Sequence, residues 1–293
     1  MSKAKTNPID YFVAGGFAGV VSRTAIAPIE RVKILFQISS GAGAAASQQQ
    51  SGLALARGIL QNEGIKAFWK GNTAAVVRVM PYMSLTFLTF EEYRASLLAM
   101  GAPKQAATLA AGSLGGVTAV VLTYPLDLVR ATMATKGCTH TGMGDALVSI
   151  YKQRGLPALY SGVSATCIGV APYAGLKFVS YEALKGCLAG LFGMREEELK
   201  PWQRLGSGLL AGMAAQTFVY PLDVVRRRMQ TGIGGAYAST LDALTTIAQK
   251  EGIRNGLYRG LGLNYLKTMP NVAIYMSLYD IVKIQLGKWS ASK

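Results

Sequence analysis

The chain has 293 residues, of which 51% are hydrophobic and 15% are charged, and it contains 34 glycines. This composition is unusual for a soluble protein but ordinary for packed membrane helices. The net charge of +15 is spread along the chain without a dense basic run or a base-stacking motif, so we expect anionic solutes and anionic lipid as partners, and no nucleic acid.

The first dozen residues contain neither the apolar core of a secretory signal nor the Arg- and Ser-rich pattern of a cleaved presequence, so we expect any targeting information to be internal. A long kinked helix is predicted over about residues 9–38. It holds two glycines four residues apart, then a proline, an acid and a base: Gly15, Gly19, Pro28, Glu30 and Lys33. The glycine spacing lets apolar helices approach each other closely.

A flexible loop, a short amphipathic helix and a second long helix are predicted next, over about residues 39–52, 53–62 and 72–98. The second long helix opens after Gly71. Ten residues beyond this glycine lies Pro81, and nineteen residues beyond it lies Phe90, which is followed by Glu91 and by a base at Arg94.

The whole pattern occurs three times, with a period near 97 residues. The later long helices are predicted at about 104–135, 163–188, 201–231 and 261–287, and the later short helices at about 144–153 and 240–250. The proline, acid and base of the first helix recur as Pro125, Asp127 and Arg130, and as Pro221, Asp223 and Arg226. The second helices open after Gly162 and Gly260, and their matching residues are Pro172, Tyr181, Glu182 and Lys185, then Pro270, Tyr279, Asp280 and Lys283.

These repeats predict an all-α membrane protein with six transmembrane helices and three tandem units, residues 1–100, 101–195 and 196–293. A helix of 30 residues extends about 45 Å, enough to cross a bilayer. An even number of spans puts both termini on one side. A proline inside a helix costs about 3 kcal/mol and a charge at membrane depth about 2.5–3.5 kcal/mol, so three copies of each require an explanation.

We expect the acid of one repeat to pair with the base of another: Glu30 with Arg130, Asp127 with Arg226, and Asp223 with Lys33. A ring of such pairs would close one end of a central cavity reversibly. The alternative is that each acid pairs with the base on its own helix. The matching residues of the second helices would close the opposite end: Glu91, Arg94, Glu182, Lys185, Asp280 and Lys283. Two such closures around one cavity permit alternating access.

The position seven residues after each opening glycine is expected to face the cavity, and it holds Arg78, Gly169 and Lys267. Two cations and a gap at one depth describe a site for an anion with a flat or bulky moiety. Neither cation has an acid within one turn of its own helix, so we expect both to bind the anion and not to pair with a carboxylate. Arg23 could supply a third cation.

Catalytic and metal-binding patterns are not found in the sequence. His140 is the only histidine, and Cys138, Cys167 and Cys187 lack metal-ligand spacing. We expect no enzymatic activity, no metal and no cofactor.

The chain resembles the mitochondrial carrier family along its whole length. The family pattern P-x-[DE]-x-x-[KR] matches Pro28 to Lys33, and the pattern [DE]-G-x4-[YWF]-[KR]-G matches Glu63 to Gly71. The second repeat departs from the latter pattern at Arg154 and Ser161, and the third has one extra residue. The resemblance implies a pseudo-threefold six-helix barrel in the mitochondrial inner membrane, with cardiolipin contacts and termini toward the intermembrane space. We also expect a monomer.

The resemblance further implies roles for single residues. The first acid-base set matches the family's matrix gate, braced by Gln37 and Gln230, while Ala134 lacks the amide. The second set matches its cytoplasmic gate, where Phe90 cannot supply a tyrosine brace. Arg78, Gly169-Val170 and Lys267 fall at its substrate contact points. A glycine followed by a small aliphatic residue resembles the subgroup that receives an adenine ring there, with Tyr173 nearby.

We therefore expect a carrier of an adenine-containing anion, coenzyme A or an adenine nucleotide, that works by exchange. Two alternatives stay open: another phosphorylated or sulfated nucleotide as cargo, such as adenosine phosphosulfates, and a peroxisomal location. A non-transporting receptor or adaptor with the same fold would predict broken gates and an uncharged cavity, and this sequence has neither.

Overall fold

The computed structural model of the protein describes residues 8–39, 51–135, 138, 140–193, 195–232 and 237–291, and the side chains from residue 14 to residue 285 within these ranges. All regular elements in this part of the chain are helices. The loop predicted at 39–52 lies mostly outside the described residues.

Six long helices form the body of the molecule: α1 (Pro8–Ile38), α3 (Asn72–Ala99), α4 (Lys104–Met133), α6 (Val163–Phe192), α7 (Pro201–Thr231) and α9 (Leu261–Ala291). Three shorter helices connect them in pairs: α2 (Gly52–Glu63), α5 (Met143–Ala158) and α8 (Thr240–Glu251). Short helical turns are present at η1 (Ile65–Trp69), η2 (Glu196–Glu198) and η3 (Ile253–Leu257). The order of long, short and long helix is the one the sequence predicts.

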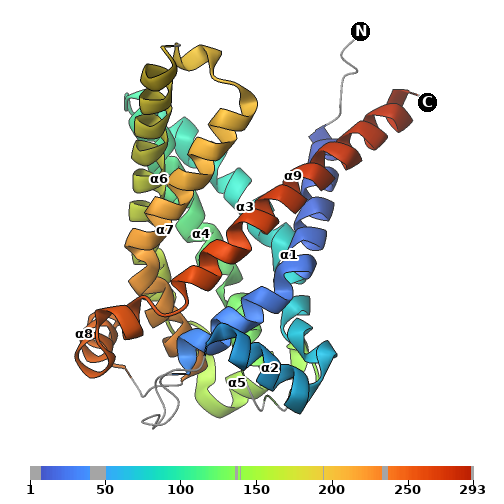
Figure 1. Ribbon diagram of the computed structural model, residues 1–293, viewed down its shortest axis with the longest axis vertical. Coiled ribbons are helices and arrows are strands. Elements are labelled where there is room, and N and C mark those ends of the chain that lie inside the picture. The colour runs from blue at the N-terminus through green and yellow to red at the C-terminus, as the bar shows by residue number, and fades with distance from the viewer. Residues whose placement is uncertain are drawn as a thin grey trace.

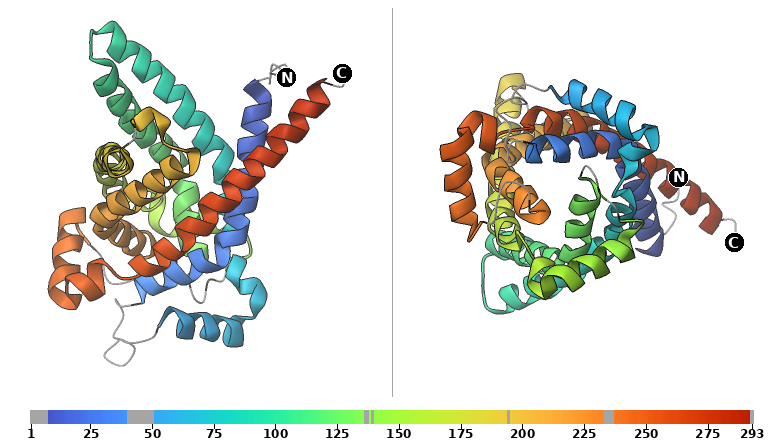
Figure 2. Two further views of the ribbon diagram at one scale, coloured as in Figure 1. Left: turned by 45° about the horizontal axis from the view of Figure 1, so that its top comes forward. Right: turned by 90° about the horizontal axis from the view of Figure 1, so that it is seen from below.

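The long helices stand in a ring, seen end-on in the right view of Figure 2. The most extensive packing joins different repeats, namely α3 with α4, α6 with α7, and α1 with α9. The start of α1 and the end of α9 lie at the same end of the molecule, and α2, α5 and α8 lie toward the other end (Figure 1). Matching positions of the three repeats therefore occupy equivalent places around one axis.

Each second long helix begins at a glycine with a backbone conformation that other residues rarely adopt. Gly71, Gly162 and Gly260 have φ of 83°, 80° and 85°. A side chain would not fit at Gly71 either, because a Cβ atom there would lie 2.8 Å from the main-chain oxygen of Arg130 in the next repeat. The glycines thus let the start of one repeat's second helix touch the end of another repeat's first helix.

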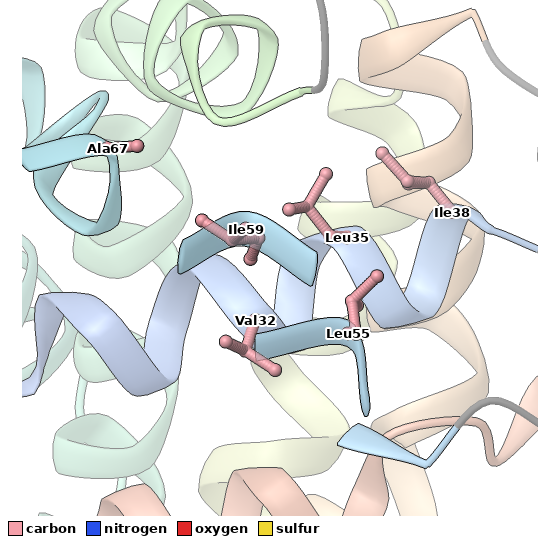
Figure 3. Close-up of a cluster of buried hydrophobic side chains, with 6 residues drawn as sticks. All are labelled: Val32, Leu35, Ile38, Leu55, Ile59 and Ala67. Atoms are coloured by element: carbon pink, nitrogen blue, oxygen red, sulfur yellow. The ribbon is translucent and has the colours of Figure 1, made fainter. Parts of the chain in front are cut away.

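The short helices are held by small apolar clusters. Figure 3 shows one in which α2 and η1 pack against the end of α1: Val32, Leu35, Ile38, Leu55, Ile59 and Ala67. The equivalent cluster under α8 contains Val225, Ala243, Ile247 and Leu257. Ile59 and Ile247, which are 0% and 1% exposed, occupy the same place in the two clusters. Burial of such a side chain contributes roughly 1.5–3 kcal/mol.

Four helical segments are long and apolar enough to cross a membrane: Ile65–Ala99, Lys104–Met133, Val163–Phe192 and Pro201–Thr231. The helices α1 and α9 both have 31 residues, like α7. They complete the ring. Arg23 lies in the middle of α1, and Lys267 lies within the first two turns of α9. All six long helices contain a proline, as the sequence predicts.

Candidate functional site

Three ion pairs connect the repeats near the end of the molecule where the short helices lie. Arg130 Nη2 lies 3.3 Å from Glu30 Oε1, Arg226 Nη2 lies 2.5 Å from Asp127 Oδ2, and Lys33 Nζ lies 2.8 Å from Asp223 Oδ2. These are the pairings predicted between repeats, and among the described residues none of the three acids pairs with the base of its own motif. The acid side chains are only 1–17% exposed, so each pair is largely shielded from water.

Glutamine side chains support two of the three ion pairs. Gln37 Nε2 donates to Asp223 Oδ2 at 3.3 Å, and Gln230 Nε2 donates to Asp127 Oδ2 at 2.8 Å. The third position is Ala134, which has no polar side chain. The contacts expected of the braces are present, and their role in a gate stays a prediction.

Two buried tyrosines complete these networks, and the sequence analysis missed them. Tyr220 Oη accepts from Gln37 Nε2 at 3.0 Å and donates to the main-chain oxygen of Arg259 at 2.9 Å. Tyr124 Oη accepts from Gln230 Nε2 at 3.1 Å and donates to the main-chain oxygen of Ser161 at 2.8 Å. Both side chains are 0% exposed. Each tyrosine therefore joins a glutamine to the turn before the next long helix.

The same tyrosine rings lie against the bases of the ion pairs. Lys33 Nζ is 5.4 Å from the centre of the Tyr220 ring, and the Arg226 guanidinium is 5.8 Å from that of Tyr124. The sequence could have pointed to these two tyrosines, because each directly precedes the proline of the repeated motif. The equivalent residue in the first repeat is Ala27, so the repeat interface that lacks a glutamine also lacks a tyrosine.

Arg78 and Lys267 differ from the sequence prediction, which left them without carboxylate partners. Arg78 Nη1 lies 2.9 Å from Asp127 Oδ1, and Lys267 Nζ lies 2.7 Å from Glu30 Oε2. The prediction was wrong on this point because it considered only acids on the same helix, whereas both partners come from other helices. Arg227, which the sequence analysis did not single out, also reaches Asp127, at 3.3 Å.

A cavity of about 320 Å³ lies beside the ion pairs. It is lined by five of the six residues predicted to bind substrate: Arg23, Arg78, Gly169, Val170 and Tyr173. Arg226 adds a third guanidinium to the lining. In the described part of the chain Arg23 forms no ion pair, so its charge is available to an anion. The sixth residue, Lys267, lines a neighbouring cavity instead.

At the opposite end of the long helices, the predicted acid-base set is arranged differently. Lys185 Nζ pairs with Glu182 on its own helix at 2.8 Å and with Glu196 of η2 at 3.0 Å. Lys185 therefore pairs with its own helix and with η2, the turn that connects the second repeat to the third. The gate role of this set stays a prediction.

The short helices of two repeats are tied by buried arginines. Glu63 Oε2 lies 2.8 Å from both Arg31 Nη2 and Lys70 Nζ. In the third repeat, Arg228 forms a two-pronged contact with Glu251 at 2.5 and 2.7 Å. Burial acts to raise the pKa of Glu63, but hydrogen bonds from Lys70 and Arg31 outweigh it and bring the pKa below its usual value. The corresponding residue of the second repeat is Arg154, which cannot play this part.

Comparison with known proteins agrees with the threefold design. The family described as "Mitochondrial carrier protein" matches the chain three times in succession, over residues 4–101, 102–191 and 197–289. The chain belongs to the mitochondrial carrier family. This carrier is thus a multi-pass protein of the mitochondrial inner membrane, as the sequence predicts.

Several relatives of the carrier are similar over almost their whole length. A mitochondrial coenzyme A transporter of Danio rerio is 40% identical over 289 residues, which cover 96% of this chain and 88% of the relative. The mitochondrial coenzyme A transporter of Mus musculus is 40% identical, with 94% and 87% covered. The mitochondrial carrier protein CoAc2 of Zea mays is also 40% identical, with 94% and 85% covered.

Proposed function

We propose that the carrier exchanges coenzyme A, or a closely related adenine-containing anion, across the mitochondrial inner membrane. One observation of the structure carries this proposal: a cavity with three guanidinium groups, Arg23, Arg78 and Arg226, lies directly beside the ion pairs between the repeats. Guanidinium groups suit phosphate oxygens, and coenzyme A carries several phosphates. Relatives about 40% identical that are named coenzyme A transporters support this choice of cargo.

The geometry also suggests how cargo and closure are linked. Arg78 contacts Asp127, and Lys267 contacts Glu30, so both cations contribute to the shielded ion-pair ring in this structure. A phosphate that binds Arg78 competes with Asp127 for the same donors. The bound anion would thereby weaken the ring and favour its opening, while the empty carrier would keep it closed.

Other properties belong to the proposal in the same way. The carrier would act as a monomer with cardiolipin at its surface, and it would neither catalyse a reaction nor bind nucleic acid. Its repeats would meet at residues 100/101 and 195/196. The six residues Glu91, Arg94, Glu182, Lys185, Asp280 and Lys283 would close the cytoplasmic end once the matrix ring opens.

Exchange by reconstituted protein tests the proposal. Liposomes loaded with coenzyme A should take up external labelled coenzyme A, and uptake of ADP, ATP and adenosine phosphosulfate in parallel ranks the competing cargoes. Arg78→Ala should lower exchange about tenfold to hundredfold, because a hydrogen bond to a charged group contributes about 1.5–3 kcal/mol. Arg254→Ala is the matched control, since Arg254 is exposed in η3. Exchange of none of the four solutes, or equal exchange by both variants, would contradict the proposal.

A further inference from the structure

A second, larger cavity adjoins the cationic one and has a different chemical character. Its volume is about 840 Å³, and it shares Tyr173 and Gln216 with the cationic cavity. The lining comes from α6, α7 and α9, three consecutive helices of the ring. A space that touches all three, and that includes Lys267, lies on the inner side of the ring. The two cavities are therefore neighbouring parts of one interior.

Apolar side chains are the largest group along the second cavity. Those used in the argument are Leu205, Leu209, Met213, Val272 and Met276. The lining also carries three cations. Lys267 is paired with Glu30, Arg204 donates to the main-chain oxygen of Glu197 at 2.6 Å, and the third is Lys177 of α6. Two flexible methionines let such a wall adapt to an elongated ligand. The apolar stretch formed by these five side chains therefore suits an uncharged group better than a phosphate.

Missing side chains on α7 create much of the space. Gly208 and Gly212 line the second cavity, and a Cβ atom added to either would first meet a tyrosine ring atom or hydroxyl 3.9 Å away. Packing between α7 and α9 is the sparsest between neighbouring long helices, and a hydrogen bond between Thr217 and Tyr265 links the two helices. At both glycines of α7 an added Cβ would stand at ordinary van der Waals distance from a tyrosine of α6, so a larger side chain there would need room that the second cavity now provides.

We propose that this second cavity, which we term the arm site, binds the long uncharged arm of the substrate while the cationic cavity holds its phosphorylated nucleotide end. The inference rests on the proposed function, and it deepens it by selecting coenzyme A over a simple adenine nucleotide. Coenzyme A has just these two parts: an adenosine with phosphates, and an extended arm that carries two amides and a terminal thiol but no charge. Gln216 and Tyr173, at the boundary, offer polar groups where the two parts join.

Transport of the whole substrate and of its nucleotide end alone tests the arm site. Gly208→Leu fills the cavity from α7, and Val272→Phe fills it from α9. Each should raise the KM for coenzyme A at least about tenfold, because even one methylene group in a pocket changes affinity by about that factor. The KM for adenosine 3′,5′-bisphosphate, which has no arm, should stay within about twofold.

Gly112→Leu is the matched control for the glycine variant. Gly112 has the same offset from its motif proline as Gly208, it does not line either cavity, and no atom lies within 4 Å of an added Cβ. Leucine favours helix more than glycine does, so the glycine variants should fold. Equal changes in KM for both solutes, or no change in either variant, would overturn the arm site. Wild-type protein that carries the bisphosphate and coenzyme A with the same KM would overturn it as well, but would leave the carrier proposal standing. Wild-type protein that carries neither would overturn both.

Discussion

At the scale of single residues, the three acids of the ring have unequal surroundings. Asp127 receives three guanidinium groups and a glutamine amide, from Arg78, Arg226, Arg227 and Gln230. Glu30 receives Arg130 and Lys267, without a glutamine. Asp223 receives Lys33 and Gln37. Loss of Asp127 would therefore leave the most buried positive charge uncompensated.

The tyrosines before the motif prolines give a testable prediction at this scale. Tyr220 connects Gln37 to the turn before α9, so we expect Tyr220→Phe and Gln37→Ala to damage the same network. Each should lower the thermal unfolding temperature and the exchange rate, with a loss of about 1 kcal/mol for each hydrogen bond that is removed. The double variant should be little worse than either single variant, because both changes break one network.

A cross-combination of variants supplies the control. Gln230→Ala belongs to the separate network of Tyr124, so its effect should add to that of Tyr220→Phe. Purified protein in detergent gives the unfolding temperatures, and liposome exchange gives the rates. Full additivity between Tyr220→Phe and Gln37→Ala would show that the tyrosine does not position the glutamine.

The sequence could identify residues whose contacts follow from the repeat, but not residues whose contacts depend on how the helices are placed. The ring pairs were predictable, because three copies of one motif must meet around an axis. Arg78 and Lys267 were assigned to the cavity, but their carboxylate partners were missed, since those acids lie on other helices whose relative register the sequence does not specify. Tyr124 and Tyr220 were missed although each directly precedes a motif proline, because the residue type alone does not say which partners a buried hydroxyl will contact.

At the scale of elements, only two of the three short helices form an ion pair with a buried arginine of the preceding long helix. α2 and α8 each have a glutamate that binds a buried arginine of the neighbouring long helix, Glu63 with Arg31 and Glu251 with Arg228. α5 has Arg154 in place of the glutamate. All three short helices reach a glycine with positive φ at the same place: Gly64 (78°) after α2, Gly155 (75°) within α5 and Gly252 (80°) after α8.

The lowered pKa of Glu63 predicts a pH dependence of stability. A carboxylate with a lowered pKa in the folded state stabilises the protein above its ordinary pKa of about 4.3, and this contribution disappears as pH falls through the lower, folded-state value. Glu63→Gln should therefore lower the unfolding temperature near pH 7 and lose less stability than wild type on acidification below about pH 4.5. If the unfolding temperatures of the two proteins fell by the same amount across this pH range, Glu63 would not be the source of the pH dependence.

Helix positions were predicted well from the sequence, and their ends less well. The predicted segment at 144–153 is observed as Met143–Ala158, because the chain resumes a helical turn after Gly155 despite Pro157. The helix predicted to end near 188 continues to Phe192, where Gly193 with φ of 60° terminates it. Sequence periodicity shows which face of a helix is apolar. It does not show where the helix ends, because a glycine ends a helix only if its backbone adopts a positive φ, which glycine permits but does not require.

At the scale of the whole molecule, the threefold design is imperfect. Two of the three interfaces between repeats carry an ion pair, a glutamine and a tyrosine, whereas the interface of Glu30 and Arg130 has alanine at both supporting positions, Ala27 and Ala134. Its ion pair is also the longest of the three. The sequence predicted the symmetry, but it could not predict the arm site, because that space depends on how far α7 and α9 diverge.

The central claim is that ion pairs between different repeats close the cavity, and a charge exchange tests it most directly. Lys33→Asp and Asp223→Lys should each abolish most exchange, since each leaves a like-charge pair in a shielded place. The double variant restores an opposite-charge pair between repeats and should recover a substantial part of the exchange rate. Exchange of the charges of Asp223 and Arg226, within one helix, should give no recovery. Recovery by the second combination and not by the first would contradict the account.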